Sequence, residues 1–177
     1  MEKLILTHYQ SSWAADFNAI ESALFPALLG ENTYLEHVGS TAVPGMMAKP
    51  IIDIDLVFQY PAEFGEIKKA LHSLGYRHRG DQGIPSREVF KRTPGQAHPI
   101  LDCIHHHLYV CQADSRELHR HLLFRDHLRQ NPEARHTYIQ LKCQLALQAE
   151  GLRRKYAALK EQKARNFIEE CLAKATE

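Results

Sequence analysis

The sequence predicts an α+β fold, in which helices pack on a mixed β-sheet and a helical segment occupies the C-terminal part of the chain. Three observations predict it. The chain has 177 residues, the size of one domain. Residues 51–58 form an apolar, β-rich run that is typical of a buried strand. From Ser115 onward the pattern becomes helical. We therefore expect one domain over residues 1–177, with an α/β core in 1–113 and helices in 114–177.

Two helices are expected within the core. Residues 13–29 carry apolar side chains at helical intervals, with Ser12 as N-cap and Gly30 as the stop. Residues 61–74 begin with a proline, which suits the first turn of a helix, and Gly75 ends them. Both helices are expected to pack over the sheet.

Extended segments alternate with these helices and are expected at 34–38, 51–58, 76–79, 87–92 and 99–111. Between the third and the fourth lies a Gly-rich loop, residues 80–85, of the right size for a substrate flap. Arg87, Lys91 and Arg92 follow it. We interpret them as exposed charges, with phosphate contact as the alternative.

The C-terminal part is expected to form three helices, with breaks near Asn131-Pro132 and near Gly151. Arg125 and Arg129 lie four residues apart on one helical face. Arg125 either pins its helix to the core through a buried carboxylate or holds a substrate phosphate. Lysines of amphipathic helices usually face solvent, so Lys142 and Lys160, with Tyr156, rank behind the arginine as binding residues.

Asp53 and Asp55 alternate along the strand at 51–58 and therefore point to the same face. Two carboxylates at this spacing repel each other unless a cation neutralises them. Mg²⁺ commonly uses one or two protein carboxylates together with substrate phosphates. The pair therefore indicates a metal site, and the alternative is a half-exposed strand with two solvated aspartates.

A turn with the character of a phosphate loop precedes this strand. Gly39 and Ser40 lie at the end of the segment 34–38, where backbone N–H groups can hold an anion. Thr41 adds a hydroxyl and Lys49 a cation. The alternative is an ordinary turn, and a Walker A loop is excluded because the Gly-Lys-Ser/Thr ending is missing.

These residues carry a resemblance to a known family. The run HVGSTAVPGMMAKPIIDI resembles the hallmark of the GrpB-like family (UPF0157), whose fold is similar to the nucleotidyltransferase superfamily. Trp13, the Leu-Gly-Tyr at 74–76 and residues 124–142 resemble further family positions, and Tyr156, Lys160 and Phe167 continue the pattern. One position departs: Tyr109 stands where the family tends to have histidine, which puts a catalytic role there in doubt.

The resemblance implies a nucleotidyltransferase-like sheet and a Mg²⁺-dependent transfer of a nucleotidyl group from a nucleoside triphosphate to an unknown acceptor. Asp53 and Asp55 would be catalytic and bind metal, while Gly39, Ser40, Thr41, Lys49 and Arg125 would bind the nucleotide phosphates. The alternative is a non-catalytic protein that binds a nucleotide or phosphometabolite. Similar domains occur fused to dephospho-CoA kinase, which suggests an accessory role in coenzyme A metabolism.

Nucleotidyltransferases of this superfamily commonly add a third carboxylate from a later strand. Asp102, at the start of the expected extended segment 99–111, is the candidate third metal ligand. The histidine triple 105–107 on the same segment permits a zinc site, but no residue at a usual spacing supplies a third ligand, so zinc is not favoured.

Composition describes an ordinary globular protein. The net charge is +1, divided as −3 over residues 1–113 and +4 over 114–177. A positive charge spread over several helices is more often a solvated face, so a nucleic-acid partner is not favoured but is not excluded. Four separated cysteines make no Cys-x-x-Cys pair and are expected to be free buried thiols in a reducing compartment. The chain has no signal-like N-terminus and no membrane-length apolar run, so we expect a cytoplasmic protein with no membrane contact.

Overall fold

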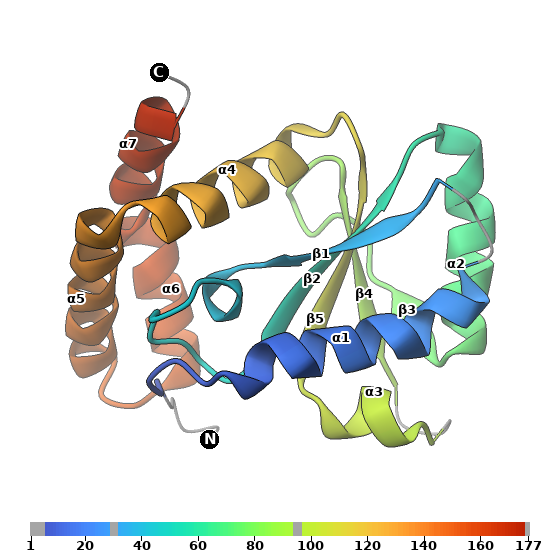
Figure 1. Ribbon diagram of the computed structural model, residues 1–177, viewed down its shortest axis with the longest axis horizontal. Helices are drawn as coiled ribbons and strands as arrows, with labels where there is room; N and C mark the ends of the chain where they lie inside the picture. Colours follow the sequence, from blue (N-terminus) through green and yellow to red (C-terminus); the bar gives the residue numbers. More distant parts are fainter. Residues whose placement is uncertain (1–5, 29–31, 94–96, 176–177) are drawn as a thin grey trace.

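A mixed sheet lies at the centre of the computed structural model, which describes residues 6–28, 32–93 and 97–175 (Figure 1). In that part of the chain it has five strands in the order β1-β2-β5-β4-β3. The β2–β5 pair is parallel and the other neighbouring pairs are antiparallel. The strands are β1 (Tyr34–Val38), β2 (Ile52–Phe58), β3 (Tyr76–His78), β4 (Arg87–Arg92) and β5 (His106–Gln112). The predicted α+β class with a mixed sheet is confirmed.

Seven α-helices surround the sheet in the described ranges, together with short 3₁₀ turns at Phe25–Ala27, Ser40–Ala42 and Pro61–Glu63. The helices are α1 (Ser12–Leu24), α2 (Phe64–Ser73), α3 (Pro99–Cys103), α4 (Arg116–Gln130), α5 (Pro132–Gln148), α6 (Arg153–Lys163) and α7 (Arg165–Ala175). Figure 1 shows α1, α2 and α3 on one side of the molecule and α4 to α7 on the other.

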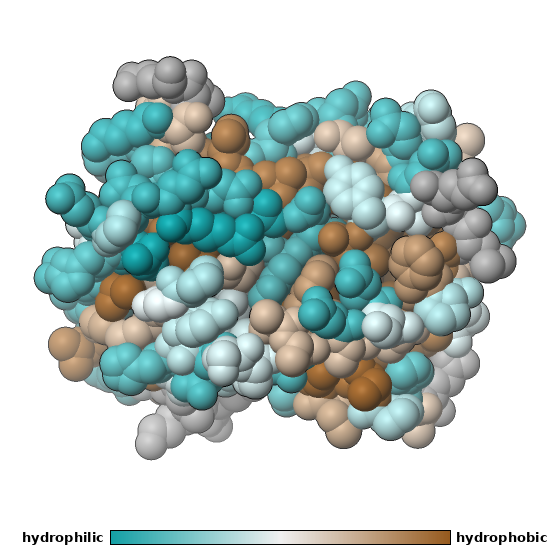
Figure 2. All heavy atoms as spheres, viewed as in Figure 1, coloured by the Kyte–Doolittle hydropathy of each residue, from teal (hydrophilic) through white to brown (hydrophobic). Residues whose placement is uncertain are grey.

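Strand alternation gives the sheet two different faces. One face is apolar and buries Ile52, Ile54 and Leu56 of β2 against α1, α2 and α3 in the largest core cluster. The opposite face carries Asp53 and Asp55, and α4 to α7 cover it. Figure 2 shows that the surface over α4 is largely hydrophilic, so the polar residues of this helix also face solvent. The polar face of the sheet is therefore enclosed by the C-terminal helices.

The predicted first helix differs from α1 at both ends. Ser11 is the N-cap and Ser12 is already helical. The α-helix stops at Leu24 and continues as a 3₁₀ turn, since Pro26 has no N–H for an α-helical hydrogen bond. The predicted end at Leu29 and Gly30 lies outside the described residues.

The prediction of an extended segment over residues 99–111 is wrong for its first half. Residues Pro99–Cys103 form α3, because Pro99 occupies the first turn and the His98 imidazole caps it by accepting from the N–H groups of Ile100 and Leu101. Asp102 consequently lies on a helix and not on a strand. Only the second half of the segment becomes β5.

The C-terminal part has four helices in the described residues, where three were expected. The predicted breaks at Asn131 and Gly151 are confirmed: the Asn131 side chain caps α5, and Gly151 has φ +74°. An additional break lies at Ala164, between α6 and α7, where the backbone leaves the helix without a glycine or proline. No turn residue marks it in the sequence.

The four cysteines are free, as expected, but they are not all buried. Cys111 and Cys171 are buried, Cys143 is half-buried and Cys103 is exposed. Cys103 is exposed because it lies at the end of α3, in the part of the chain where a strand was expected.

Candidate functional site

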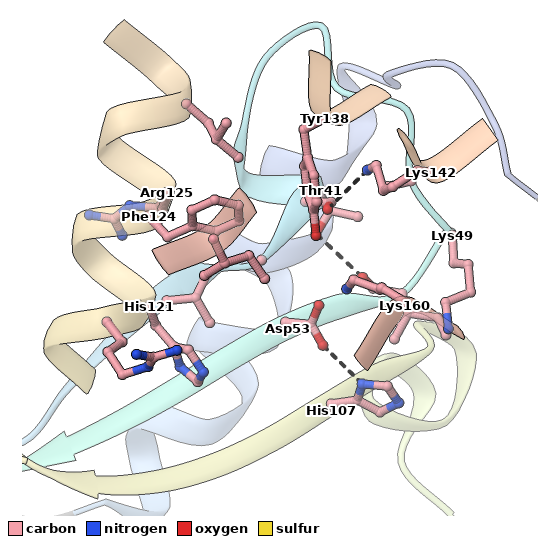
Figure 3. Close-up of a pocket in the computed structure, with 18 of the residues that line it drawn as sticks. Thr41, Lys49, Asp53, His107, His121, Phe124, Arg125, Tyr138, Lys142 and Lys160 are labelled. Carbon is pink, nitrogen blue, oxygen red and sulfur yellow. Dashed lines mark hydrogen bonds and ion pairs between the residues drawn. The ribbon is translucent and has the colours of Figure 1, made fainter. Parts of the chain in front are cut away.

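A cavity of about 390 Å³ lies between the polar face of the sheet and the C-terminal helices (Figure 3). It is lined by the turn after β1, by β2 and β5, and by α4, α5 and α6. The volume is in the range of small-molecule sites. Its lining is rich in cations and aromatic rings, namely Lys49, Arg87, Arg120, Arg125, Lys142, Lys160, His107, His121, Tyr109, Phe124, Tyr138 and Tyr156.

Gly39 lines the cavity and has a backbone conformation that only glycine adopts easily, with φ +71° and ψ −167°. A Cβ atom added there would lie 2.4 Å from Oδ2 of Asp53. The glycine therefore lets the turn approach the first aspartate of β2 directly. The sequence prediction that this turn and this strand act together is consistent with that contact.

Asp53 forms a hydrogen-bonded pair with His107 across the parallel strands. Nδ1 of His107 lies 2.9 Å from Oδ1 of Asp53, and the two residues are register partners of β2 and β5. Burial by itself would raise the pKa of Asp53, but the hydrogen bond and charge of His107, together with Lys160 and His121, lower it below its usual value. Asp53 is therefore an anion, hydrogen-bonded to His107 and near the charges of Lys160 and His121.

Asp55 points to the same face, as predicted, but it is fully buried and does not line the cavity. Its Oδ2 lies 2.7 Å from Nδ1 of His121, whose Nε2 lies 3.4 Å from Glu117. Burial opposes the charge of His121, yet the two carboxylates raise its pKa to about 9. His121 is therefore a cation fixed between two acids beneath the cavity wall.

The side chains of the predicted phosphate loop have internal partners. The Thr41 hydroxyl is buried, donates to the Ile51 carbonyl at 3.3 Å and lies 3.0 Å from Nε2 of His37. Lys49 lines the cavity with its ammonium 5.5 Å from the centre of the Tyr156 ring. Thr41 thus stabilises the turn, and both Thr41 and Lys49 line the cavity.

Ser40 receives a hydrogen bond from a lysine that the sequence analysis ranked low. Nζ of Lys142, from α5, donates to Ser40 Oγ at 3.1 Å and to the Met47 carbonyl, and lies 5.0 Å from the Tyr138 ring centre. Its side chain is only 2% exposed. Burial, and then the charge of Lys160, lower the pKa of Lys142 to about 7.

Lys160, from α6, is the second lysine at this end of the cavity. Tyr138 and Tyr156, and after them Asp53, raise its pKa above the usual value although burial opposes them. Figure 3 shows the side chain of Lys160 close to Asp53. The two lysines and Ser40 form what we call the lysine end of the cavity: Ser40, Lys142 and Lys160.

One signal in the sequence could have ranked Lys142 higher. Tyr138, Lys142, Leu145 and Ala149 are all buried and recur at spacings of four, three and four. A lysine inside an apolar helical stripe is not solvent-side. His121 follows the same rule on α4, between the buried Leu118 and Leu128.

Arg125 takes the first of the two roles considered for it. Its guanidinium lies 2.5 Å from Glu36 of β1, donates to the His37 carbonyl at 3.1 Å, and pairs with Asp126 at 2.8 Å. With 10% of its side chain exposed, it pins α4 to the sheet at the edge of the cavity. Arg125 also lines the cavity, and its contact with a ligand phosphate stays a prediction.

The structure does not bring Asp102 to this site. Its carboxylate pairs with Arg92 at 2.6 Å, accepts from the His98 N–H at 2.6 Å, and lines a separate, wider cavity. The expectation that it joins Asp53 and Asp55 is corrected, because α3 replaces the strand on which that expectation depended. The loop 80–85 likewise lines no part of the first cavity, so it is not placed as a flap over it.

The expected Mg²⁺ can be tested against the carboxylate set. The third carboxylate was expected on a later strand, but β5, the strand parallel to β2, places His107 and Tyr109 beside Asp53 and Asp55. On β1 the only carboxylate opposite them is Glu36, which pairs with Arg125. The strands therefore supply no third ligand for a two-metal site.

Both aspartates also already have a histidine partner. Each aspartate has one oxygen within hydrogen-bond distance of an imidazole, and Oδ1 of Asp55 is buried without a hydrogen-bond partner in the described part of the chain. Within the same residues, no group of three or more His, Cys, Asp or Glu side chains is arranged to hold a metal. The set does not fit a pair of magnesium ions.

Tyr109, which departs from the family pattern, is held beneath Arg87. The guanidinium carbon of Arg87 lies 4.6 Å from the ring centre, and burial raises the pKa of Tyr109. Tyr109 is the β5 register partner of Asp55. It closes the site next to Asp55 as a neutral side chain.

The model of a family described as "GrpB protein" matches residues 3–174. The "UPF0157 protein YqkA" of Bacillus subtilis is 31% identical over 82% of this chain, and the match covers 40% of that protein. A dephospho-CoA kinase of Mycolicibacterium paratuberculosis is 28% identical over 84% of this chain and 41% of its own length. The chain thus spans less than half of either relative.

Two solved structures show the likeness in three dimensions. The conserved protein GrpB from Enterococcus faecalis has a TM-score of 0.79 and 33% identity, covering 98% of this chain and all of that one. The Cid1 poly(U) polymerase, solved with MgGTP, has a TM-score of 0.56 at 12% identity and covers 78% of this chain and 44% of its own. The fold is therefore nucleotidyltransferase-like. Across the described ranges, no helix combines the length and the apolar character that spanning a membrane requires.

Proposed function

The chain belongs to the GrpB family, and from that premise we propose that it binds a nucleotide or a related phosphometabolite in the cavity described above. The likeness to Cid1 supports a nucleotide-type ligand at the level of the fold alone. The specific support is the lysine end of the cavity.

One observation carries the proposal: the amine of Lys142 is buried, and its hydrogen bonds and ring contact are all with neutral groups. Its amine meets a hydroxyl, a carbonyl and an aromatic face, and the like charge of Lys160 lowers its pKa further. A buried charge without a counter-charge is costly. A phosphate group beside Ser40 would supply that counter-charge to both lysines, which a neutral ligand would not.

The remainder of the cavity suits the rest of such a ligand. Phe124, Tyr138 and Tyr156 offer aromatic surface next to the lysine end, and their rings can contact a base or another planar group. A cavity of about 390 Å³ accommodates a ligand of nucleotide size when part of it projects to solvent.

Mg²⁺-dependent nucleotidyl transfer is the second candidate. It is favoured by the nucleotidyltransferase-like fold and by the contact between the Gly39 turn and Asp53. The missing third carboxylate counts against it. Sequence similarity to a dephospho-CoA kinase supports an accessory role beside coenzyme A precursors, so dephospho-CoA is included among the test ligands.

The test is calorimetric titration of ATP, GTP, CTP, UTP and dephospho-CoA, each in EDTA and in Mg²⁺. We expect binding of at least one ligand in EDTA, weakened about tenfold or more by Lys142→Met, because a charge-assisted contact contributes about 1.5–3 kcal/mol. Lys155→Met is the matched control, since Lys155 pairs with Glu150 at the surface and does not line the cavity.

The outcomes separate the two candidates. Binding that appears only with Mg²⁺, and is lost in the Asp53→Asn/Asp55→Asn double variant, would favour nucleotidyl transfer and justify a screen of acceptors. No binding of any of the five ligands under either condition would overturn the proposed function.

A further inference from the structure

Two aspartate–histidine pairs occupy the polar face of the sheet, and they differ in one respect. Both ring nitrogens of His121 face carboxylates, Asp55 at 2.7 Å and Glu117 at 3.4 Å. His107 gives Nδ1 to Asp53 at 2.9 Å, and within residues 6–28, 32–93 and 97–175 its Nε2 has no hydrogen-bond partner. Only the His107 ring has a nitrogen left for a ligand.

The position of His107 makes that nitrogen accessible. Its side chain is 43% exposed, against 23% for His121, and it lines the cavity. Figure 3 shows the second ring nitrogen of His107 pointing away from Asp53. A small molecule in the cavity can therefore meet the imidazole on the side opposite to its carboxylate.

The backbone fixes the pair. Asp53 and His107 are register partners on adjacent parallel strands, and the Gly39 turn lies against the other oxygen of Asp53. An aspartate that accepts from Nδ1 sets the tautomer, so that Nε2 carries the lone pair and can accept a proton. This arrangement is typical of a histidine that acts as a general base.

The charges of the cavity complement that role. The lysine end lies on the same cavity and carries the cations that would stabilise a departing pyrophosphate. His107, Lys142 and Lys160 all line this cavity, so the base and the cations surround one volume.

From this we infer that His107 is the general base, and Asp53 its positioning residue, for attack of water on the α-phosphorus of a bound nucleoside triphosphate, without a divalent cation. The inference rests on the proposed function. The oxygen of water forms a bond to the α-phosphorus while its proton passes to Nε2. The bond from the α-phosphorus to the bridging oxygen breaks, and pyrophosphate leaves with the electron pair. The proton then returns to solvent.

The experiment measures pyrophosphate release from ATP, GTP, CTP and UTP in excess EDTA, alongside calorimetry on the same samples. We expect turnover of any nucleotide that binds. His107→Gly should lower the rate about 100-fold or more, which is the usual contribution of a general base. Imidazole added to the buffer should restore part of that rate, because the truncated position is half-exposed, and a purely structural role would not respond to it.

Two further variants sharpen the result. Asp53→Asn keeps the shape of the side chain but removes its charge, and we expect a rate loss with nucleotide affinity retained within a few fold. His105→Gly is the matched control, because His105 is an exposed neighbour that does not line the cavity. It should release pyrophosphate at the wild-type rate.

Nucleotide binding without pyrophosphate release in EDTA would overturn the inference and leave the proposed function intact. Equal rates in wild type and His107→Gly, or a variant that imidazole does not rescue, would overturn it as well. Absence of binding would be a failure of the proposed function itself, and calorimetry on the wild type distinguishes that case.

Discussion

Replacing Gly39 by alanine tests the contact on which the site is built. The substitution places a Cβ at φ +71° and ψ −167°, a backbone region almost exclusive to glycine, at a cost of about 1–3 kcal/mol. The new atom also lies 2.4 Å from Oδ2 of Asp53 and 3.0 Å from its Cβ, so the carboxylate must move. Moving it weakens the 2.9 Å hydrogen bond to His107, at a further cost of about 1–2 kcal/mol.

The expected loss for Gly39→Ala is therefore about 2–5 kcal/mol of the free energy of unfolding. Such a loss leaves most domains folded, since their total stability is about 5–15 kcal/mol. Urea denaturation monitored by circular dichroism measures it. Gly65→Ala is the control of opposite sign: a Cβ there meets nothing within 4 Å, and alanine stabilises a helix by up to about 1 kcal/mol relative to glycine.

A double-mutant cycle divides the loss between its two causes. In an Asp53→Ala background the carboxylate is absent, so the part due to its displacement should disappear, while the backbone strain and the 3.0 Å contact with Cβ of residue 53 remain. We expect a coupling of about 1–2 kcal/mol between the two positions. A Gly39→Ala protein within about 0.5 kcal/mol of wild type, or a cycle with no coupling, would refute the reasoning.

Two further predictions concern pH. His121 has a pKa of about 9 in the folded protein, above its ordinary 6.5. The contribution of protonated His121 to the stability of the folded protein is therefore complete below about pH 6.5 and is lost as the pH rises through about 9. His121→Gln should be less stable than wild type by up to about 3 kcal/mol near pH 6 and should converge with it above about pH 10, as measured by urea denaturation. The pH dependence that Lys142 gives to the stability has the opposite sign, because its pKa is lowered from 10.5 to about 7. The folded protein binds this proton less readily than the unfolded chain, so the cost of the buried cation grows as the pH falls from about 10 to about 7. Lys142→Met should therefore be more stable than wild type at neutral pH, by about 1–4 kcal/mol, and equal stabilities across the range would contradict this.

The local parts of the site could be predicted from the sequence. Alternation along an apolar strand was enough to place Asp53 and Asp55 on one face, and turn residues were enough to place Gly39 and Ser40 at the end of β1. Each of these depends on a few consecutive residues and on rules that tertiary contacts seldom reverse.

The parts that the sequence did not reveal depend on contacts between distant segments. The interaction of Lys142 with Ser40 joins residues 102 positions apart, and no local pattern ranks one helical lysine above another except its place in a buried stripe. Asp102 was misplaced for a different reason. The apolar run after Pro99 suits a strand, and the imidazole cap of His98, which starts the helix, is a signal that residue preferences do not contain.

The parallel pairing of β2 with β5 has a consequence for how the protein folds. Asp53 and His107 lie 54 residues apart, whereas β1 and β2 are antiparallel neighbours joined by the Gly39 turn. Closing the longer loop costs more chain entropy, so contacts of high sequence separation form later. During refolding, the Gly39 turn should acquire its structure before the imidazole of His107 reaches the carboxylate.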